Sequence, residues 1–128
     1  MSALPNLTAL NFLAVGAGAA LGAWLRWLLG VALNPMLIAL PLGTLAANVL
    51  GGYLIGAAVG LFHLNTDLPA AFKLFAITGF LGGLTTFSTF SAEVVERLLA
   101  GQPAWAISLA ALHLAGSLTA TWLGLLTV

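Results

Sequence analysis

The sequence has very little charge and no cysteine. Of its 128 residues, 5% are charged and 62% are hydrophobic. Soluble domains usually carry about 25% charged residues, which keep their surfaces in contact with water. Three basic residues are too few to follow a nucleic-acid backbone, and a chain without cysteine has neither disulfides nor a cysteine–zinc site. The composition excludes a soluble domain, a disordered segment, a coiled coil and a nucleic-acid binder. It indicates a protein embedded in the lipid bilayer.

Long apolar runs without alternation predict helices and not strands. A bilayer core about 30 Å thick requires roughly 20 apolar residues of helix, whereas membrane β-strands alternate apolar and polar residues. Pro41 suits the first turn of a helix. We therefore expect an all-α membrane protein in which residues 1–128 form a single integral membrane domain. Its four expected spans cover approximately residues 7–33, 41–63, 71–99 and 104–128.

The few basic residues give no firm orientation in the membrane. With four spans, Lys73 lies on the side of both termini, and Arg26 and Arg97 lie toward the opposite side. A difference this small does not decide the topology by the positive-inside rule. Two interpretations stay open: a small protein has few charges of any kind, or the chain inserts in both directions and pairs with an inverted copy of itself.

Small residues recur at four-residue intervals in several of the expected spans. In a bilayer, such residues let helix backbones approach closely and associate. We expect most of them to pack helices together, both within the bundle and between subunits. The stripes are Gly18 and Gly22; Gly43, Ala47 and Gly51; Gly52, Gly56 and Gly60; and Gly116, Ala120 and Gly124.

The third expected span contains the stretch Gly-Phe-Leu-Gly-Gly-Leu-Thr-Thr-Phe-Ser-Thr-Phe-Ser at residues 79–91. Two adjacent glycines disfavour a helix interior. Non-helical backbone at membrane depth is tolerated only where it is buried in protein or lines a wet cavity, and its free carbonyls suit cations such as Na⁺. We predict a break near Gly82–Thr85 in mid-membrane, with a cation at or beside it. The alternative is an unbroken helix whose hydroxyls bond to carbonyls one turn earlier.

Two phenylalanines follow the predicted break, with hydroxyl side chains between them. Phe87 and Phe90 are three residues apart and share a helix face, and Ser88 and Thr89 lie between them. The edge of an aromatic ring is electropositive, so it can meet an anion without holding it as tightly as a lysine would. The pair is therefore a candidate anion site, and simple core packing is the alternative.

Uncharged polar residues in two other spans could complete such a site. Thr44 and Asn48 are one turn apart in the second span, and His113, Ser117 and Thr121 form a polar stripe in the fourth. A small, strongly hydrated anion needs donors in place of its water, and weak binding at several sites suits conduction. His113 is either a buried, neutral, hydrogen-bonded side chain or a pH sensor.

The remaining charges have simpler interpretations. Arg26 can extend to the membrane surface, or it can draw anions into a vestibule. Glu93 and Arg97 are one turn apart in the order that favours pairing, so we expect them to form an ion pair near the surface.

The stretch at residues 79–91 resembles the signature of the Fluc fluoride channels, also called CrcB proteins. The resemblance extends to the sequences at residues 22–27, 41–48 and 115–118. It implies an antiparallel, dual-topology homodimer with two pores in the inner membrane of a bacterium. Such a dimer exports toxic fluoride passively and contains a structural Na⁺ at its centre that is not transported.

The same resemblance assigns roles to particular residues of this chain. The main-chain carbonyls of Gly82 and Thr85 would bind the Na⁺ in both subunits. The rings that flank fluoride correspond to Phe87 and Phe90. The basic residue of the first helix corresponds to Arg26. The remaining pore positions correspond to Asn48, Ser117, Ser88 and Thr89.

Two rival functions remain beside the fluoride channel. A proton-coupled multidrug exporter requires an ionisable carboxylate in the middle of a span, whereas Glu93 and Glu96 lie toward the end of the third. A structural subunit without transport is the second rival. We do not expect an enzyme, because no convincing base accompanies the hydroxyls.

Overall fold

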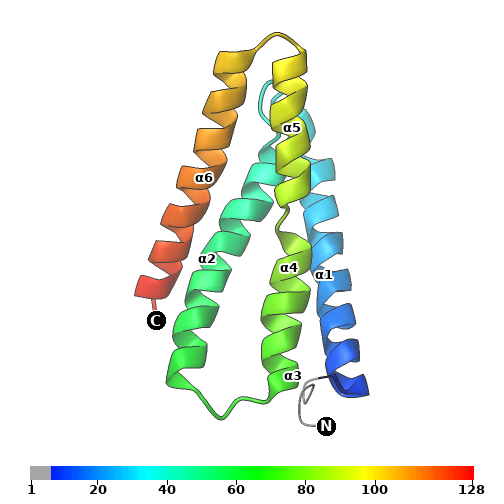
Figure 1. Ribbon diagram of the computed structural model, residues 1–128, viewed down its shortest axis with the longest axis vertical. Coiled ribbons are helices and arrows are strands. Elements are labelled where there is room, and N and C mark those ends of the chain that lie inside the picture. The colour runs from blue at the N-terminus through cyan, green and yellow to red at the C-terminus, as the bar shows by residue number, and fades with distance from the viewer. Residues whose placement is uncertain (1–6) are drawn as a thin grey trace.

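The computed structural model describes residues 7–128, and all regular structure in that range is helical. Four helical stretches in it are long and apolar enough to cross a membrane (Figure 1). They cover Ala9–Met36, Leu42–Leu64, Ala70–Leu99 and Pro103–Leu126. The expectation of an all-α protein with four spans is therefore confirmed.

The ends of these helices follow from local chemistry. Helix α1 (Ala9–Leu33) begins after Thr8, whose hydroxyl accepts a hydrogen bond from the Asn11 amide. It ends where Pro35 enforces the short 3₁₀ turn η1 (Asn34–Met36). Helix α2 (Leu42–Leu64) follows Pro41, and helix α6 (Pro103–Leu126) begins at a proline, which loses no helical hydrogen bond there.

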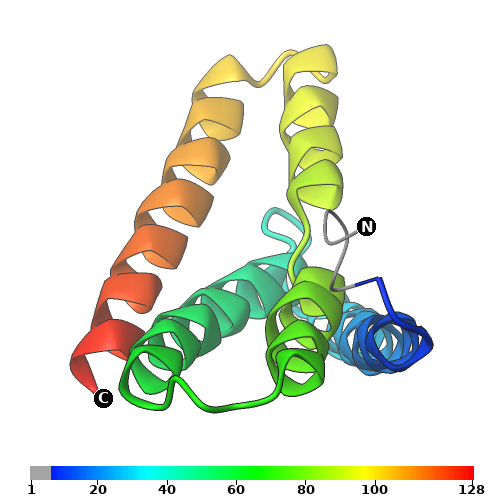
Figure 2. The same cartoon turned by 60° about the horizontal axis from the view of Figure 1, so that its bottom comes forward.

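The third span is assembled from several pieces. Helix α3 (Ala70–Lys73) continues into the π-helical segment η2 (Leu74–Leu81) and the single turn α4 (Gly82–Leu84). Thr85 (φ −85°, ψ 154°) and Thr86 (φ −147°, ψ 119°) then have extended backbone, and helix α5 (Phe87–Leu99) begins. Figure 2 shows α5 leaving the line of α4 and standing beside α6, whereas η2 and α4 pack against α1.

Glycines determine how closely the helices approach one another. A Cβ atom built on Gly56 of α2 would collide with the carbonyl oxygen of Thr121 in α6. One built on Gly124 of α6 would collide with the carbonyl oxygen of Tyr53 in α2. The two backbones therefore touch directly at this crossing, as small residues allow in membrane helices.

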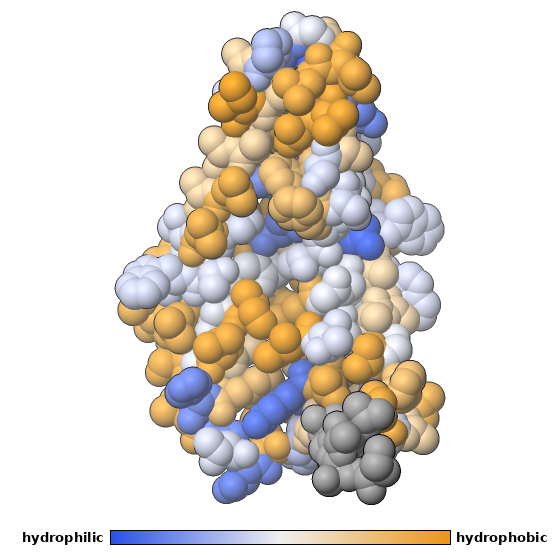
Figure 3. Space-filling view, viewed as in Figure 1, coloured by the Kyte–Doolittle hydropathy of each residue, from blue (hydrophilic) through white to orange (hydrophobic). Residues whose placement is uncertain are grey.

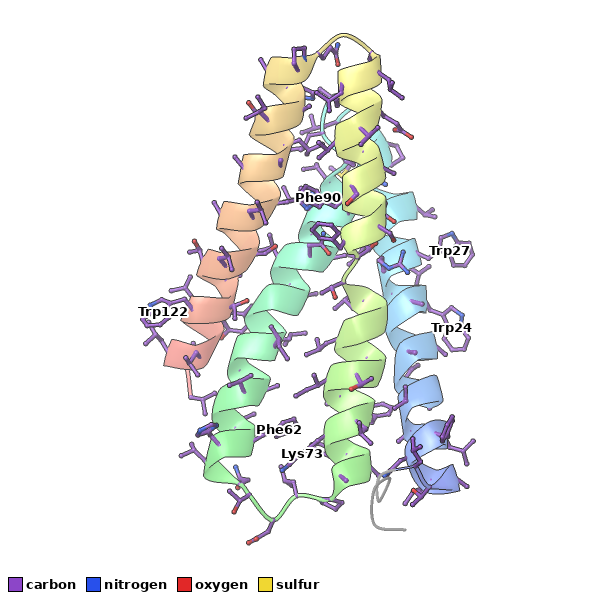
Figure 4. The ribbon with its side chains drawn as sticks, in the orientation of Figure 1. Trp24, Trp27, Phe62, Lys73, Phe90 and Trp122 are labelled. Carbon is purple, nitrogen blue, oxygen red and sulfur yellow. The ribbon has the colours of Figure 1, made fainter. Side chains whose placement is uncertain are left out.

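The outer surface is strongly apolar. Orange, hydrophobic side chains cover much of the face shown in Figure 3, whereas the side chains of Ala47 and Leu84 in the small interior are fully buried. Trp24, Trp27 and Trp122 point outward from α1 and α6 in Figure 4. This inversion of the usual soluble pattern is expected for a bundle whose solvent is lipid.

Replacing Gly124 by alanine tests the importance of the α2–α6 contact. We expect Gly124→Ala to lower the thermal stability of the protein in detergent, because overpacking a close contact typically costs about 1–3 kcal/mol. Gly16→Ala is the matched control, since a Cβ at this helical glycine meets no atom within 4 Å. Melting curves from circular dichroism measure both variants, and equal melting temperatures would contradict the role of Gly124.

Candidate functional site

The backbone between α4 and α5 is held by a single side chain from α2. The Asn48 Oδ1 atom accepts a hydrogen bond from the Thr86 amide at 2.7 Å. Its Nδ2 atom donates to the Thr86 carbonyl oxygen at 3.0 Å. A primary amide presents a donor and an acceptor side by side, as a neighbouring backbone would. Asn48 therefore satisfies both polar groups of a residue that is outside any helix.

The extended residues change the partners of nearby carbonyl groups. In an α-helix, each carbonyl accepts from the amide four residues later. The Thr86 amide, which would serve Gly82, bonds to Asn48, and the Thr89 amide, which would serve Thr85, bonds to the Thr86 hydroxyl at 3.0 Å. The carbonyl groups of Gly82 and Thr85 therefore lack their regular helical partners.

Arg26 of α1 binds to the same segment. Its Nε atom donates to the Gly83 carbonyl oxygen at 3.0 Å. A guanidinium bonded to a partly buried backbone carbonyl forms a charge-assisted hydrogen bond. Arg26 is therefore fixed against the end of α4 and does not extend freely to the membrane surface.

His113 of α6 is a further polar side chain in contact with Asn48. Its Nδ1 atom lies 3.2 Å from Asn48 Nδ2, and its ring stacks on Phe90 with centroids 4.5 Å apart. The histidine is only 3% exposed, and its Nε2 atom has no hydrogen-bond partner among residues 7–128. Both amide protons of Asn48 are thus directed at acceptors of the chain itself, the Thr86 carbonyl oxygen and the His113 ring.

The two phenylalanines lie at the mouth of a groove between α2, α4, α5 and α6. Phe87 and Phe90 meet edge to face, with centroids 5.5 Å apart. Phe90 is buried and points into the bundle (Figure 4), whereas Phe87 is 74% exposed. The groove has a volume of about 440 Å³ and is otherwise mostly apolar. Its polar lining consists of Asn48, Thr85, Thr86, His113 and Ser117.

A second, more polar cavity lies on the other side of Thr86. It measures about 310 Å³. Its lining contains Arg26, Trp27, Gly30, Val31, Asn34, Thr44, Thr86 and Thr89. Thr86 is common to both hollows, so they meet at this residue. We call them the apolar groove and the polar cavity.

The predicted site residues are therefore divided between two places. Gly82, Thr85, Phe87, Phe90, Asn48 and Ser117 line the apolar groove, and Arg26, Thr44 and Thr89 line the polar cavity. Ser88 lines neither hollow: it is exposed, and its hydroxyl lies 3.3 Å from that of Thr86. The sequence did not single out Thr86 itself, although its place three residues after the double glycine was the available signal.

The expected ion pair between Glu93 and Arg97 was wrong. Thr44 Oγ1 donates to Glu93 Oε1 at 2.6 Å, and Glu93 Oε2 is buried without a partner among the described residues. Arg97 donates instead to Gln102 and to two backbone carbonyls before α2. Glu93 thus belongs with Thr44 beside the polar cavity. The spacing of residues within one helix could not predict this hydrogen bond, because Thr44 and Glu93 are 49 residues apart in the sequence.

Comparison with known proteins places these features in a family. The family model described as "CrcB-like protein, Camphor Resistance (CrcB)" matches residues 13–125. A protein of Dechloromonas aromatica is 79% identical over the whole chain, which covers 95% of that relative. A protein of Nitrosospira multiformis is 66% identical over 90% of each chain, and one of Ralstonia nicotianae is 59% identical over 95% of this chain and 97% of its own. All three are named fluoride-specific ion channel FluC.

Proposed function

The chain belongs to the CrcB family, and on that premise we propose that it is a fluoride-specific ion channel. It would let fluoride leave a bacterial cell down its electrochemical gradient and so relieve fluoride toxicity. The observation that carries this proposal is the 79% identity over the full chain to a relative named as such a channel. The protein is accordingly a multi-pass protein of the bacterial inner membrane and not an enzyme.

The arrangement around Asn48 suits an anion that binds water strongly. Fluoride must exchange its water for other donors, and an uncharged lining releases it again more easily than a lysine or arginine would. Phe87, Phe90 and Ser117 line the apolar groove, where ring edges and a hydroxyl group would be available to the anion. At Asn48, fluoride would take the amide proton that His113 Nδ1 accepts in its absence, so one hydrogen bond replaces another.

The polar cavity provides the second part of the path. Arg26, held against Gly83, places a positive charge at its wall, and Thr44 and Thr89 add hydroxyl groups. We assign this cavity the role of a vestibule that attracts fluoride toward Thr86. Ser88, exposed next to the Thr86 hydroxyl, is placed in the pore by the resemblance of its motif alone.

The functional unit we propose is an antiparallel homodimer with two pores. The apolar groove is open on one side, and Phe87, a proposed pore residue, is 74% exposed in the single chain. A second copy inverted in the membrane would cover these surfaces. The extended backbone of Thr85 and Thr86 supports a third span that is broken in mid-membrane, close to the axis relating two inverted copies.

We propose a structural Na⁺ at that axis. The carbonyl groups of Gly82 and Thr85 lack their regular helical partners, and carbonyl oxygens are suitable ligands for a hard cation. Two carbonyls from each subunit would give four ligands. No cluster of three or more His, Cys, Asp or Glu side chains occurs in the part of the chain that the structure describes, so main-chain oxygens are the better ligands.

Fluoride efflux from liposomes that contain only the purified protein tests the channel. We expect fluoride efflux and negligible chloride efflux. Efflux of neither ion would support the structural subunit. Proton-coupled uptake of an organic cation that is abolished by Glu93→Gln would support the exporter. One carboxylate oxygen of Glu93 is buried and has no hydrogen-bond partner among residues 7–128, so this variant examines the observation that favours the exporter.

Two substitutions in the apolar groove test the assignment of the pore. We expect Asn48→Ala and Phe87→Ala to lower fluoride efflux about tenfold or more. Asn48→Ala removes a hydrogen bond to a charged group, which contributes roughly 1.5–3 kcal/mol, and Phe87→Ala removes an electropositive ring edge. Phe72→Ala is the matched control, since Phe72 forms a similar edge-to-face pair with Phe62 far from the groove. Light scattering verifies that each variant is still a dimer, and wild-type efflux in both groove variants would refute the assignment.

A single introduced thiol tests the inverted dimer. The natural chain has no cysteine, and Thr66 lies in the exposed turn between α2 and α3. In Thr66→Cys, we expect about half of the thiols to react with a membrane-impermeant reagent added outside intact cells, and the other half only after lysis. Labelling from one side alone would exclude dual topology.

Removal of sodium tests the proposed cation. We expect long exposure to sodium-free buffer with a large organic cation to lower fluoride efflux, because the facing carbonyl groups would repel one another without a cation between them. Addition of Na⁺ should restore the rate. A rate that does not change with Na⁺ would contradict this part of the proposal.

A further inference from the structure

Two side chains at the α5–α6 end hold the loop that precedes α2, and a third bonds to one of them. Arg97 Nη2 donates to the carbonyl oxygens of Ile38 at 3.4 Å and Ala39 at 3.2 Å. Trp105 Nε1 donates to the same Ala39 oxygen at 2.8 Å, and Gln102 Oε1 accepts from Arg97 Nη1 at 3.2 Å. We call Arg97, Gln102 and Trp105 the clasp. Arg97 and Trp105 donate to main-chain carbonyl groups of the loop. These groups are uncharged and are present whatever side chains the loop carries.

A displacement of this loop would also displace the first turn of α2. Ala39 is two residues before Pro41, whose ring fixes φ, and α2 begins at Leu42. Pro41 contributes no side-chain cap to the helix. A second tie at this point is Asn34 Oδ1, which accepts from the Gly43 amide at 2.7 Å. The clasp and Asn34 therefore both hold the start of α2, where Gly43 also packs against the backbone of Leu29 and Gly30 in α1.

The first turn of α2 carries Thr44, whose hydroxyl holds Glu93 at 2.6 Å. Glu93 and Arg97 are one turn apart and lie on the same face of α5. Helix α5 thus contacts the start of α2 at two points, directly through Glu93 and indirectly through Arg97 and Ala39. If the loop moved away, Thr44 would leave Glu93, and a carboxylate with one oxygen already unpaired would be free to turn toward the polar cavity.

We propose that Arg97 is a positioning residue for the ion path, which it controls by seating the loop through the clasp. By fixing the start of α2, it keeps Thr44 on Glu93 and keeps the glutamate out of the path of an anion. Direct attraction of anions is a weaker explanation, because Glu93 and Glu96 on the same helix outnumber the single charge of Arg97. This inference rests on the proposed fluoride conduction.

The experiment uses the full-length protein in liposomes and compares variants that each remove a donor of the clasp. We expect Trp105→Phe to lower fluoride efflux two- to five-fold and Arg97→Lys to lower it further, because a lysine presents all its donors from one nitrogen and cannot reproduce the separate Nη1 and Nη2 contacts of the guanidinium. Trp122→Phe is the matched control: Trp122 lies on the same helix, is 62% exposed and has no hydrogen bond in the structure of residues 7–128.

A double variant separates positioning from other roles of Arg97. If Arg97 acts through Thr44, Arg97→Lys in a Thr44→Ser background will show its full effect, because serine keeps the hydroxyl. In a Thr44→Val background, which has already lost the bond, it will show little further effect. Equal additional losses in the two backgrounds would overturn the proposal, as would a loss that disappears at high salt.

Hydrogen exchange gives a measurement that does not depend on conduction. We expect the amides of residues 43–46 to exchange at least several-fold faster in Trp105→Phe and Arg97→Lys than in the wild type or Trp122→Phe. Unchanged exchange in both clasp variants would overturn the positioning role even if the protein conducts fluoride. Faster exchange in a protein that conducts no fluoride would refute the proposed function and, with it, the link from the clasp to transport.

Discussion

The pair of hydrogen bonds between Asn48 and the backbone of Thr86 is the interaction on which the rest of the structure depends. A chain that leaves helical geometry at membrane depth must find other partners for its amide and carbonyl groups. One side chain of α2 supplies both. Because it does, the Gly82 carbonyl loses its regular helical partner, and α5 begins on a new line beside α6, where Phe87 and Phe90 line the apolar groove. Asn48 therefore has two functions, since the amide that stabilises the backbone is also the proposed fluoride donor.

The direct contacts between helix backbones provide the frame for this interaction. Gly56 and Gly124 let α2 and α6 touch, and Gly43 lets α2 approach the carbonyl oxygen of Leu29 in α1. With α2 fixed between these neighbours, Asn48 reaches Thr86 on one side and His113 on the other. A helix held less closely would leave a gap at Thr86, and water or lipid would compete for its polar groups. Close packing at small residues and the hydrogen bonding of the Thr86 backbone groups thus support each other.

Much of this architecture could be predicted from the sequence, and the part that could not depends on tertiary contacts. Apolar runs and prolines indicated the four spans, because lipid exposure and helix starts leave local signals. The spacing of Phe87 and Phe90 indicated a shared face for the same reason. The separation of the polar residues into two hollows was not predictable, since it depends on which side of Thr86 each helix lies. Glu93 shows the limit of such predictions. Its spacing within α5 predicted an ion pair with Arg97, but in the fold its carboxylate accepts a hydrogen bond from Thr44.

The exposed tryptophans make the intrinsic fluorescence of the protein sensitive to its surroundings. Trp24, Trp27 and Trp122 are between 59% and 67% exposed on the bundle surface. Trp105 is also 39% exposed, so all four indole rings of the chain are in contact with the medium around the bundle. The intrinsic fluorescence of this protein is consequently a probe of acyl chains, detergent or a covering subunit more than of its own interior. Quenchers attached along lipid tails would distinguish the faces that stay in lipid from those that an assembled partner shields.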